Sequence, residues 1–244
     1  LCYCRHKAQH LGHACDAPTE NCLSIGGGAN YVLRRGFARP IERSEALRIL
    51  DEARERGLVQ IADNVQNQPS YICNCCRCCC GQLQAINTYD LHAVNPSAFV
   101  PRLSDERCSG CGLCAKACPI SALELVPAAS GERREARPRL HPDRCIGCGV
   151  CASRCARKAL RMAPRETRPY VPVNAVERII RQALERGRLA NFVFDEGAGR
   201  GSRFLNRVLK AIGDLPPARR ALANEQLRSR FIRAALLAVR DPTE

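Results

Sequence analysis

The residues best suited to chemistry are the cysteines, which number 18 in a chain of 244 residues. That share is about 7%, several times the content of an ordinary globular protein. Most of them stand two or three residues apart, a spacing that suits thiolates converging on one metal centre and is poor for disulfide geometry. Two runs have the spacing Cys-x2-Cys-x2-Cys-x3-Cys, which is typical of the loops that wrap a 4Fe-4S cluster. They consist of Cys108, Cys111, Cys114 and Cys118, and of Cys145, Cys148, Cys151 and Cys155.

The two runs belong to an internal repeat. Residues 107–123 align on residues 144–160 at an offset of 37, with ten identities in 17 positions that include all four cysteines. On these motifs, residues 105–163 resemble the bacterial-type dicluster ferredoxins, and the resemblance implies two 4Fe-4S clusters. It also implies that the last cysteine of each run is exchanged between the repeats. One cluster would then be held by Cys108, Cys111, Cys114 and Cys155, and the other by Cys145, Cys148, Cys151 and Cys118.

Four of the ten remaining cysteines lie near the start of the chain. They are Cys2, Cys4, Cys15 and Cys22. Four soft thiolates predict a metal site, and the spacing leaves open whether it holds a further iron-sulfur cluster or zinc. His6, His10 and His13 have helical spacing within this segment. They are either additional ligands or solvated side chains on a short helix.

The other six cysteines are crowded into one short segment without ferredoxin spacing. They are Cys73, Cys75, Cys76, Cys78, Cys79 and Cys80. Either a subset such as Cys73, Cys76 and Cys79 completes a cluster with a distant thiolate, or the segment holds a non-standard cluster or redox-active thiols. Cys79-Cys80-Gly81 resembles the Cys-Cys-Gly motif of heterodisulfide-reductase-type proteins, whose clusters handle disulfide chemistry. The order of all these motifs along the chain resembles a group of uncharacterised 4Fe-4S dicluster proteins of anaerobic bacteria.

The elements that must position these cysteines predict an α+β fold in three parts. A Cys-rich α/β metal-binding region at residues 1–104 is followed by a small ferredoxin-like dicluster domain at 105–163 and a helical region at 164–244. Apolar spacing predicts a helix over 46–53 that ends at Gly57, strands over 58–62 and 138–140, and three C-terminal helices over 176–186, 204–212 and 218–239. The glycine run 26–28 is predicted to be a turn because no phosphate-loop residues follow it.

Composition and charge narrow the function classes. No run of apolar residues approaches the 18 needed to cross a membrane. The formal net charge of +14 would suggest nucleic-acid binding, but aromatic residues are only 5% and each oxidised four-thiolate cubane contributes about −2. The basic surface is therefore expected to dock an acidic redox partner protein or partner subunit, with nucleic acid an unlikely ligand. So many thiolates need a reducing compartment, which predicts the cytoplasm. Because the chain begins at Leu1 without Met, a leading segment is predicted to be missing, and a secretory or twin-arginine signal stays open.

Three functions compete at this point. The leading hypothesis is an electron-transfer protein or subunit that relays single electrons through two, three or four 4Fe-4S clusters, as a component of an oxidoreductase system rather than a stand-alone enzyme. The second is a reductase in which the segment from Cys73 to Cys80 holds a substrate-binding cluster or redox thiols. The third is an iron-sulfur redox sensor.

Overall fold

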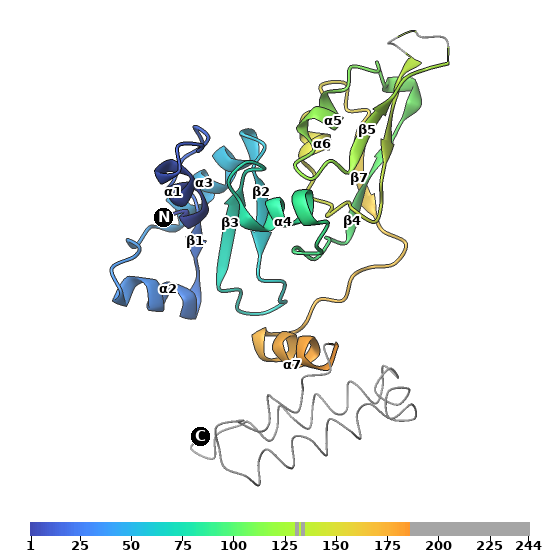
Figure 1. Cartoon of the computed structure of the whole chain (residues 1–244). Coiled ribbons are helices and arrows are strands. Elements are labelled where there is room, and N and C mark those ends of the chain that lie inside the picture. The colour runs from blue at the N-terminus through green and yellow to red at the C-terminus, as the bar shows by residue number, and fades with distance from the viewer. Residues whose placement is uncertain (130–131, 133–134, 186–244) are drawn as a thin grey trace, which may run out of the picture. The chain divides into compact units, whose positions relative to one another are not determined.

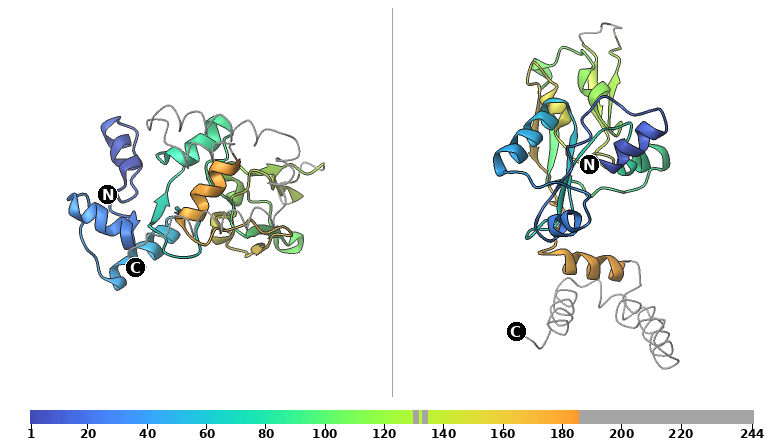
Figure 2. Two further views of the ribbon diagram at one scale, coloured as in Figure 1. Left: turned by 90° about the horizontal axis from the view of Figure 1, so that it is seen from below. Right: turned by 90° about the vertical axis from the view of Figure 1, so that its left-hand side faces the viewer.

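The computed structural model describes residues 1–129, 132 and 135–185. The chain divides into two compact units. The first comprises Leu1–Asp63 and Gln68–Tyr170 and contains every cysteine, while the second comprises Asn64–Asn67 and the chain from Val171 onward. Figure 1 gives the elements of both units, and Figure 2 shows them in two further views.

The first half of unit 1 is a small α/β arrangement around a three-stranded antiparallel sheet of order β1-β3-β2. Its strands are β1 (Leu23–Ser24), β2 (Val59–Ala62) and β3 (Tyr71–Cys75), and its helices are α1 (Tyr3–His10), α2 (Gly26–Arg34), α3 (Arg43–Glu55) and α4 (Gly81–Tyr89). The register places Ile61 opposite Cys73 and Val59 opposite Cys75. The sheet therefore brings the cysteines of β3 beside the apolar residues of β2.

Two elements of this half test local expectations. The helix predicted over 46–53 is α3, which ends before Gly57, a residue with a φ of +75°. The turn predicted at Gly26–Gly28 is wrong, because these residues form the first turn of α2. Gly28 lies against the backbone of Ser70, the residue before β3. A Cβ at Gly28 would come within 2.6 Å of the Ser70 carbonyl oxygen. The glycines thus allow close packing at the start of a helix.

The second half of unit 1 consists of two antiparallel strand pairs and two short helices. One pair is β4 (Phe99–Leu103) with β7 (Leu160–Pro164), and the other is β5 (Leu123–Val126) with β6 (Arg137–Leu140). The helices α5 (Leu113–Ala117) and α6 (Val150–Ser153) each follow one cysteine loop, and a 3-10 turn (Asp105–Arg107) precedes the first loop. The strand predicted at 138–140 is β6.

The internal repeat is visible in the backbone geometry. Gly112 and Gly149, which begin α5 and α6, have φ values of +75° and +78°, a region that glycine enters without a Cβ penalty. The amide of Ala122 donates to the Cys118 Sγ over 3.2 Å, and the amide of Ala159 donates to the Cys155 Sγ over the same distance. The two copies therefore hold the last cysteine of each run in the same way.

A single hydrophobic cluster joins the two halves of unit 1. It contains Val59 of β2, Leu83 and Ile86 of α4, and residues of the repeat such as Ile120 and Leu160. Five of its sixteen buried members are cysteines: Cys80, Cys114, Cys118, Cys145 and Cys151. The Cys-rich region and the repeat consequently form one compact unit. The division of the chain into three domains at residues 1–104, 105–163 and 164–244 stays a prediction.

Unit 2 contains α7 (Ala175–Glu185), the orange helix in Figures 1 and 2. It agrees with the first of the three predicted C-terminal helices, whereas those predicted at 204–212 and 218–239 lie outside the described residues. The amides of Gln66 and Asn67 donate to the carbonyls of Pro172 and Val173. In the part of the chain that the structure describes, no helix combines the length and apolar character needed to span a membrane.

Candidate iron-sulfur and metal centres

The first set of thiols in the repeat surrounds a cavity of about 230 Å³. Its cysteines are Cys108, Cys111, Cys114 and Cys155. Three come from the loop before α5 and from α5 itself, while Cys155 follows α6 in the second run. Arg107 and Arg157 also line this cavity, and Cys111 is exposed to solvent. Burial raises the pKa of the Cys114 thiol.

The second set surrounds a smaller cavity of about 20 Å³. Its cysteines are Cys145, Cys148, Cys151 and Cys118. Burial is the main cause that raises the pKa of Cys148 to about 11 and that of Cys151 to about 12, and the neighbouring thiols add to both shifts. Arg165 opposes this trend at Cys145, where its guanidinium donates to the backbone carbonyl over 2.5 Å.

Both sets fit a 4Fe-4S cluster by their donor chemistry. Each offers four thiols around a cavity, three from one loop and one from the other repeat, and backbone amides already donate to the Sγ of Cys118 and of Cys155. Hydrogen bonds to the sulfurs and positively charged neighbours both stabilise such clusters. Residues 107–159 match the family described as 4Fe-4S dicluster domain. These residues form an iron-sulfur domain. Searches of the curated proteins and of the solved structures returned no match.

Outside the dicluster domain, four thiols gather at one point. The Sγ atoms of Cys15, Cys76, Cys78 and Cys79 all lie within 4.8 Å of one another. Three of these residues belong to the turn after β3, and Cys15 lies in the loop after α1. The amide of Cys80 closes the turn by donating to the Cys76 carbonyl over 3.2 Å.

Arg5 of α1 is fully buried beside this four-thiol set. Its guanidinium donates to the Cys76 Sγ over 3.3 Å, to the Asn21 Oδ1 over 3.1 Å and to the Pro18 carbonyl. Against the effect of burial, the Ala17 backbone and then the Arg5 guanidinium lower the pKa of Cys15 to about 7. Asn21 is held in turn by Asn74 of β3, whose amide donates to the Asn21 carbonyl over 2.5 Å. A buried polar network therefore fixes the cation against the thiols.

The six remaining thiols form a connected row rather than a compact tetrahedron. The row runs through Cys2, Cys22, Cys73, Cys75, Cys80 and Cys4. Hydrogen bonds from the thiols of Cys22 and Cys75 lower the pKa of Cys73 to about 4, and the Cys75 thiol lowers that of Cys80 to about 6. The thiols of Cys73 and Cys80 in turn raise the pKa of Cys75. Opposite shifts on neighbouring thiols are expected where sulfurs are crowded enough to share protons.

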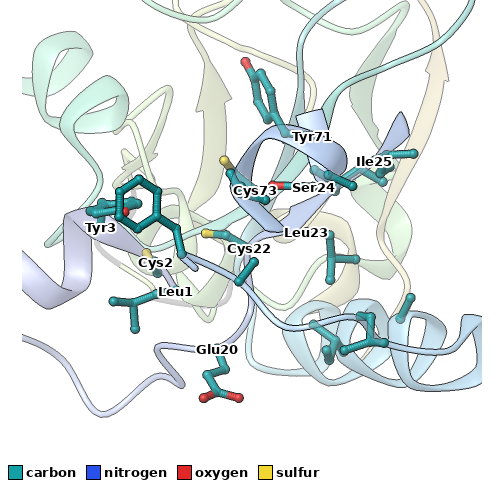
Figure 3. A pocket seen from close by; sticks show the side chains of 18 of the residues that line it. Leu1, Cys2, Tyr3, Glu20, Cys22, Leu23, Ser24, Ile25, Tyr71 and Cys73 are labelled. Carbon is teal, nitrogen blue, oxygen red and sulfur yellow. The ribbon is translucent and has the colours of Figure 1, made fainter. Parts of the chain in front are cut away.

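A cavity of about 960 Å³ opens beside this row. Cys2, Cys22 and Cys73 lie together at its wall, with Tyr71 and Leu23 nearby (Figure 3). Apolar side chains of β1, α2, α3 and the segment between α2 and α3 form part of the remaining lining, together with charged residues such as Glu20 and Arg39. The cavity could therefore accept a largely apolar molecule next to three sulfurs.

The fold divides the N-terminal cysteines differently from their order in the sequence. Cys15 joins Cys76, Cys78 and Cys79, whereas Cys2, Cys4 and Cys22 join the row that includes Cys73. The two exposed rings of His6 and His10 contact each other, with 3.3 Å between the Nε2 atoms, and neither belongs to the four-thiol set. His13 lies beyond α1 and contacts the Leu11 carbonyl.

Arg77 connects the crowded segment to the dicluster domain. It stands between Cys76 and Cys78, and its guanidinium donates to the Cys118 carbonyl and to the Ser121 Oγ, both over 2.9 Å. Sequence reasoning missed both Arg5 and Arg77. The only available signal was their position next to cysteines in Cys4-Arg5 and Cys76-Arg77-Cys78.

Proposed function

We propose that this chain is an electron-transfer protein or subunit that relays single electrons through two 4Fe-4S clusters in the dicluster domain and a third cluster in the N-terminal half. The observation that carries the proposal is the pair of cavities in the domain, each lined by three cysteines of one run and the last cysteine of the other. The match of residues 107–159 to a dicluster family supports the same chemistry. Such clusters take up and release one electron at a time.

The first cluster is assigned to Cys108, Cys111, Cys114 and Cys155, and the second to Cys145, Cys148, Cys151 and Cys118. Pairwise substitution tests this exchange. If Cys111 and Cys155 serve one cluster, the double variant Cys111→Ala/Cys155→Ala should lose about four irons per chain, no more than either single variant. The control pair Cys148→Ala/Cys155→Ala should lose about eight. Iron analysis of anaerobically purified protein distinguishes the two assignments, and a reversed pattern would exclude the exchange.

The third cluster is assigned to the row of six thiols. Cys80 lies in the same hydrophobic cluster as Cys114 and Cys118, and Cys73 and Cys75 pack against it, so the row and the domain share one apolar core. We place it next to the cluster that includes Cys118, because Arg77 reaches that residue. Wild-type protein should then contain about 12 sulfide-bound irons, and Cys73→Ala should contain about eight. An unchanged iron content in Cys73→Ala would remove the third cluster from the proposal.

The partner of this relay is expected to be an acidic redox protein in a reducing compartment such as the cytoplasm. Arg107 and Arg157 line the cavity of the first cluster, and Lys116 of α5 and Lys158, three residues after Cys155, are exposed. Complementary charge steers the encounter of redox proteins. The exposed side of the first cluster is therefore the proposed point of electron exchange.

A second candidate function is a reductase, favoured by the cavity of about 960 Å³ beside Cys2, Cys22 and Cys73. Reduction of a disulfide consumes two electrons and two protons, and the clusters would supply the electrons singly. Addition of a dialkyl disulfide to the dithionite-reduced protein discriminates the candidates. A change of the EPR spectrum that disappears in Cys22→Ala would favour the reductase, whereas an unchanged spectrum favours the relay.

A further inference from the structure

The spacing of the sulfurs in the four-thiol set is that of a site for one metal ion. The Sγ atoms of Cys78 and Cys79 are 3.6 Å apart, and those of Cys79 and Cys15 are 3.9 Å apart. Four thiolates placed tetrahedrally around a zinc ion at about 2.3 Å have sulfurs about 3.8 Å apart. A four-iron cluster instead places a separate iron beneath each thiolate, with inorganic sulfide between the irons, so its cysteine sulfurs stand further apart.

The dicluster domain provides the comparison within the same molecule. Among the described residues, no other three or more Cys, His, Asp or Glu side chains bring their ligand atoms within 4.8 Å of one another. The eight thiols assigned to the cubanes are therefore more widely spaced, and cavities lie among them. The cavity of about 230 Å³ at the first set thus leaves space for a polynuclear cluster, whereas the sulfurs of the four-thiol set lie close together.

The charge around the four-thiol set is compatible with a bound divalent cation. Arg5 is fully buried, and its guanidinium donates to the Cys76 Sγ over 3.3 Å. Its Nε is buried without a hydrogen-bond partner. Burial of a guanidinium without a counter-ion is strongly unfavourable. Four thiolates around a divalent ion carry a net charge of −2, which supplies that counter-ion.

Apolar packing covers part of the four-thiol set. Ala8 of α1, together with Ala53 and Leu58 from α3 and the residues after it, forms a small hydrophobic cluster with Cys76 and Cys79, and Cys15 packs against it. Structural zinc sites have four protein ligands and no open position, whereas catalytic sites keep one position for water or substrate. Cys76 and Cys79 inside this cluster, Cys15 packed against it and the exposed Cys78 together supply four protein ligands, the number that the structural class uses.

We propose that Cys15, Cys76, Cys78 and Cys79 bind one divalent metal ion tetrahedrally, in the manner of a structural zinc site, with Arg5 as its buried counter-ion. The ion would join the loop after α1 to the turn after β3. It would thereby hold α1, and Arg5 with it, beside the row of six thiols. This inference rests on the spacing of the four sulfurs and not on the proposed relay, so either can fail without the other.

The test is the metal and sulfide content of the full chain purified without oxygen. Cys15→Ala should lose one metal ion per chain and no acid-labile sulfide, whereas the control Cys108→Ala should lose iron and sulfide together and keep that ion. Loss of iron and sulfide in equal amounts from Cys15→Ala would overturn the proposal, as would unchanged metal content. The EPR spectrum of the dicluster domain reports whether Cys15→Ala is folded.

Two measurements keep the inference falsifiable if Cys15→Ala does not fold. X-ray absorption at the zinc edge of the wild-type protein should give four sulfur neighbours at about 2.3 Å. The proposal would be overturned if the protein lacked stoichiometric zinc and also had less than one iron per chain in excess of its sulfide. Arg5→Gln should lower the affinity of the protein for the ion by about tenfold or more, measured by competition with a chelator. A loss of this size is the usual effect of removing a residue that hydrogen-bonds to a metal ligand. The exposed control Arg34→Gln should not change the release, and equal release from both variants would exclude the role of Arg5.

Discussion

Arg165 is the charged side chain that contacts the second cluster set most directly. Its guanidinium donates to the Ser97 carbonyl over 2.9 Å and to the Cys145 carbonyl over 2.5 Å, and it counteracts the rise that burial imposes on the pKa of Cys145. A cation in this position stabilises the more negative, reduced form of a cluster. We therefore expect Arg165 to raise the reduction potential of the proposed second cluster.

Replacing Arg165 by Gln should lower the reduction potential of the second cluster by on the order of 50 mV, slightly less than the 59 mV that corresponds to a tenfold change in a one-electron equilibrium. The potential of the first cluster should change less, because the cysteine to which Arg165 donates, Cys145, belongs to the second set. Redox titration followed by EPR measures both potentials. The exposed Arg168→Gln controls for the change in net charge, and an equal shift in both variants would contradict the assignment.

Single residues also differ in how far the sequence can predict them as ligands. The first three cysteines of each run are neighbours in the chain, so their spacing alone groups them. Cys15 and Cys79 are 64 positions apart, and only the folding of β3 beside α1 brings them to 3.9 Å. Arg5 is one of many arginines in a basic chain, and nothing in the sequence marks it as buried.

The loop that carries Cys145 and Cys148 depends on a glycine between them. Gly147 has a φ of +69°, and a Cβ there would clash with the Phe99 carbonyl oxygen and the Ser97 Oγ. Ser97 itself donates from its amide to the Ile146 carbonyl over 2.9 Å. The segment before β4 therefore lies directly on the cluster loop, and the close approach requires glycine.

Gly147→Ala should destabilise the protein by about 3 kcal/mol, since the clash involves backbone that cannot move aside. Gly149→Ala is the matched control. Its φ of +78° is similar, but its added Cβ would meet only the Met162 side chain at 3.8 Å, so it should cost about 1 kcal/mol for the left-handed backbone alone. The urea midpoint of anaerobic protein, followed by cluster absorbance, measures both. Equal midpoints for the two variants would contradict the packing argument.

Elements were predictable where local signals determined them. Apolar spacing and a terminating glycine were sufficient for α3, because amphipathic helices bury one face. The start of α2 was not, since Gly28 is explained by its approach to Ser70, a contact between distant segments. The pairing of β4 with β7 also joins the two ends of the repeat and leaves no local signal.

At the scale of the whole molecule, the negative charge of the proposed metal sites offsets part of the net charge of +14. Each oxidised cubane contributes about −2 and a four-thiolate divalent site contributes the same, so much of the positive charge is offset internally. The cations that remain exposed around the first cluster, including Arg107 and Arg157, are then available to a partner. Composition could predict the excess charge, but its location needed the fold.

Reversing the charges of Arg107 and Arg157 should therefore slow electron transfer to an acidic protein. The double variant Arg107→Glu/Arg157→Glu is expected to reduce the second-order rate constant with an acidic flavodoxin by roughly tenfold at low salt. The rate should also lose most of its dependence on ionic strength, because that dependence reports charge complementarity. Stopped-flow kinetics at several salt concentrations measures both effects. An uncharged benzoquinone serves as the oxidant that should react equally with the variant and the wild-type protein.

The variant Arg34→Glu/Arg35→Glu makes the same change in net charge at the end of α2, away from the lining of the first cluster's cavity. If it slowed the flavodoxin reaction equally, the effect would belong to net charge, and the partner surface would have to lie elsewhere.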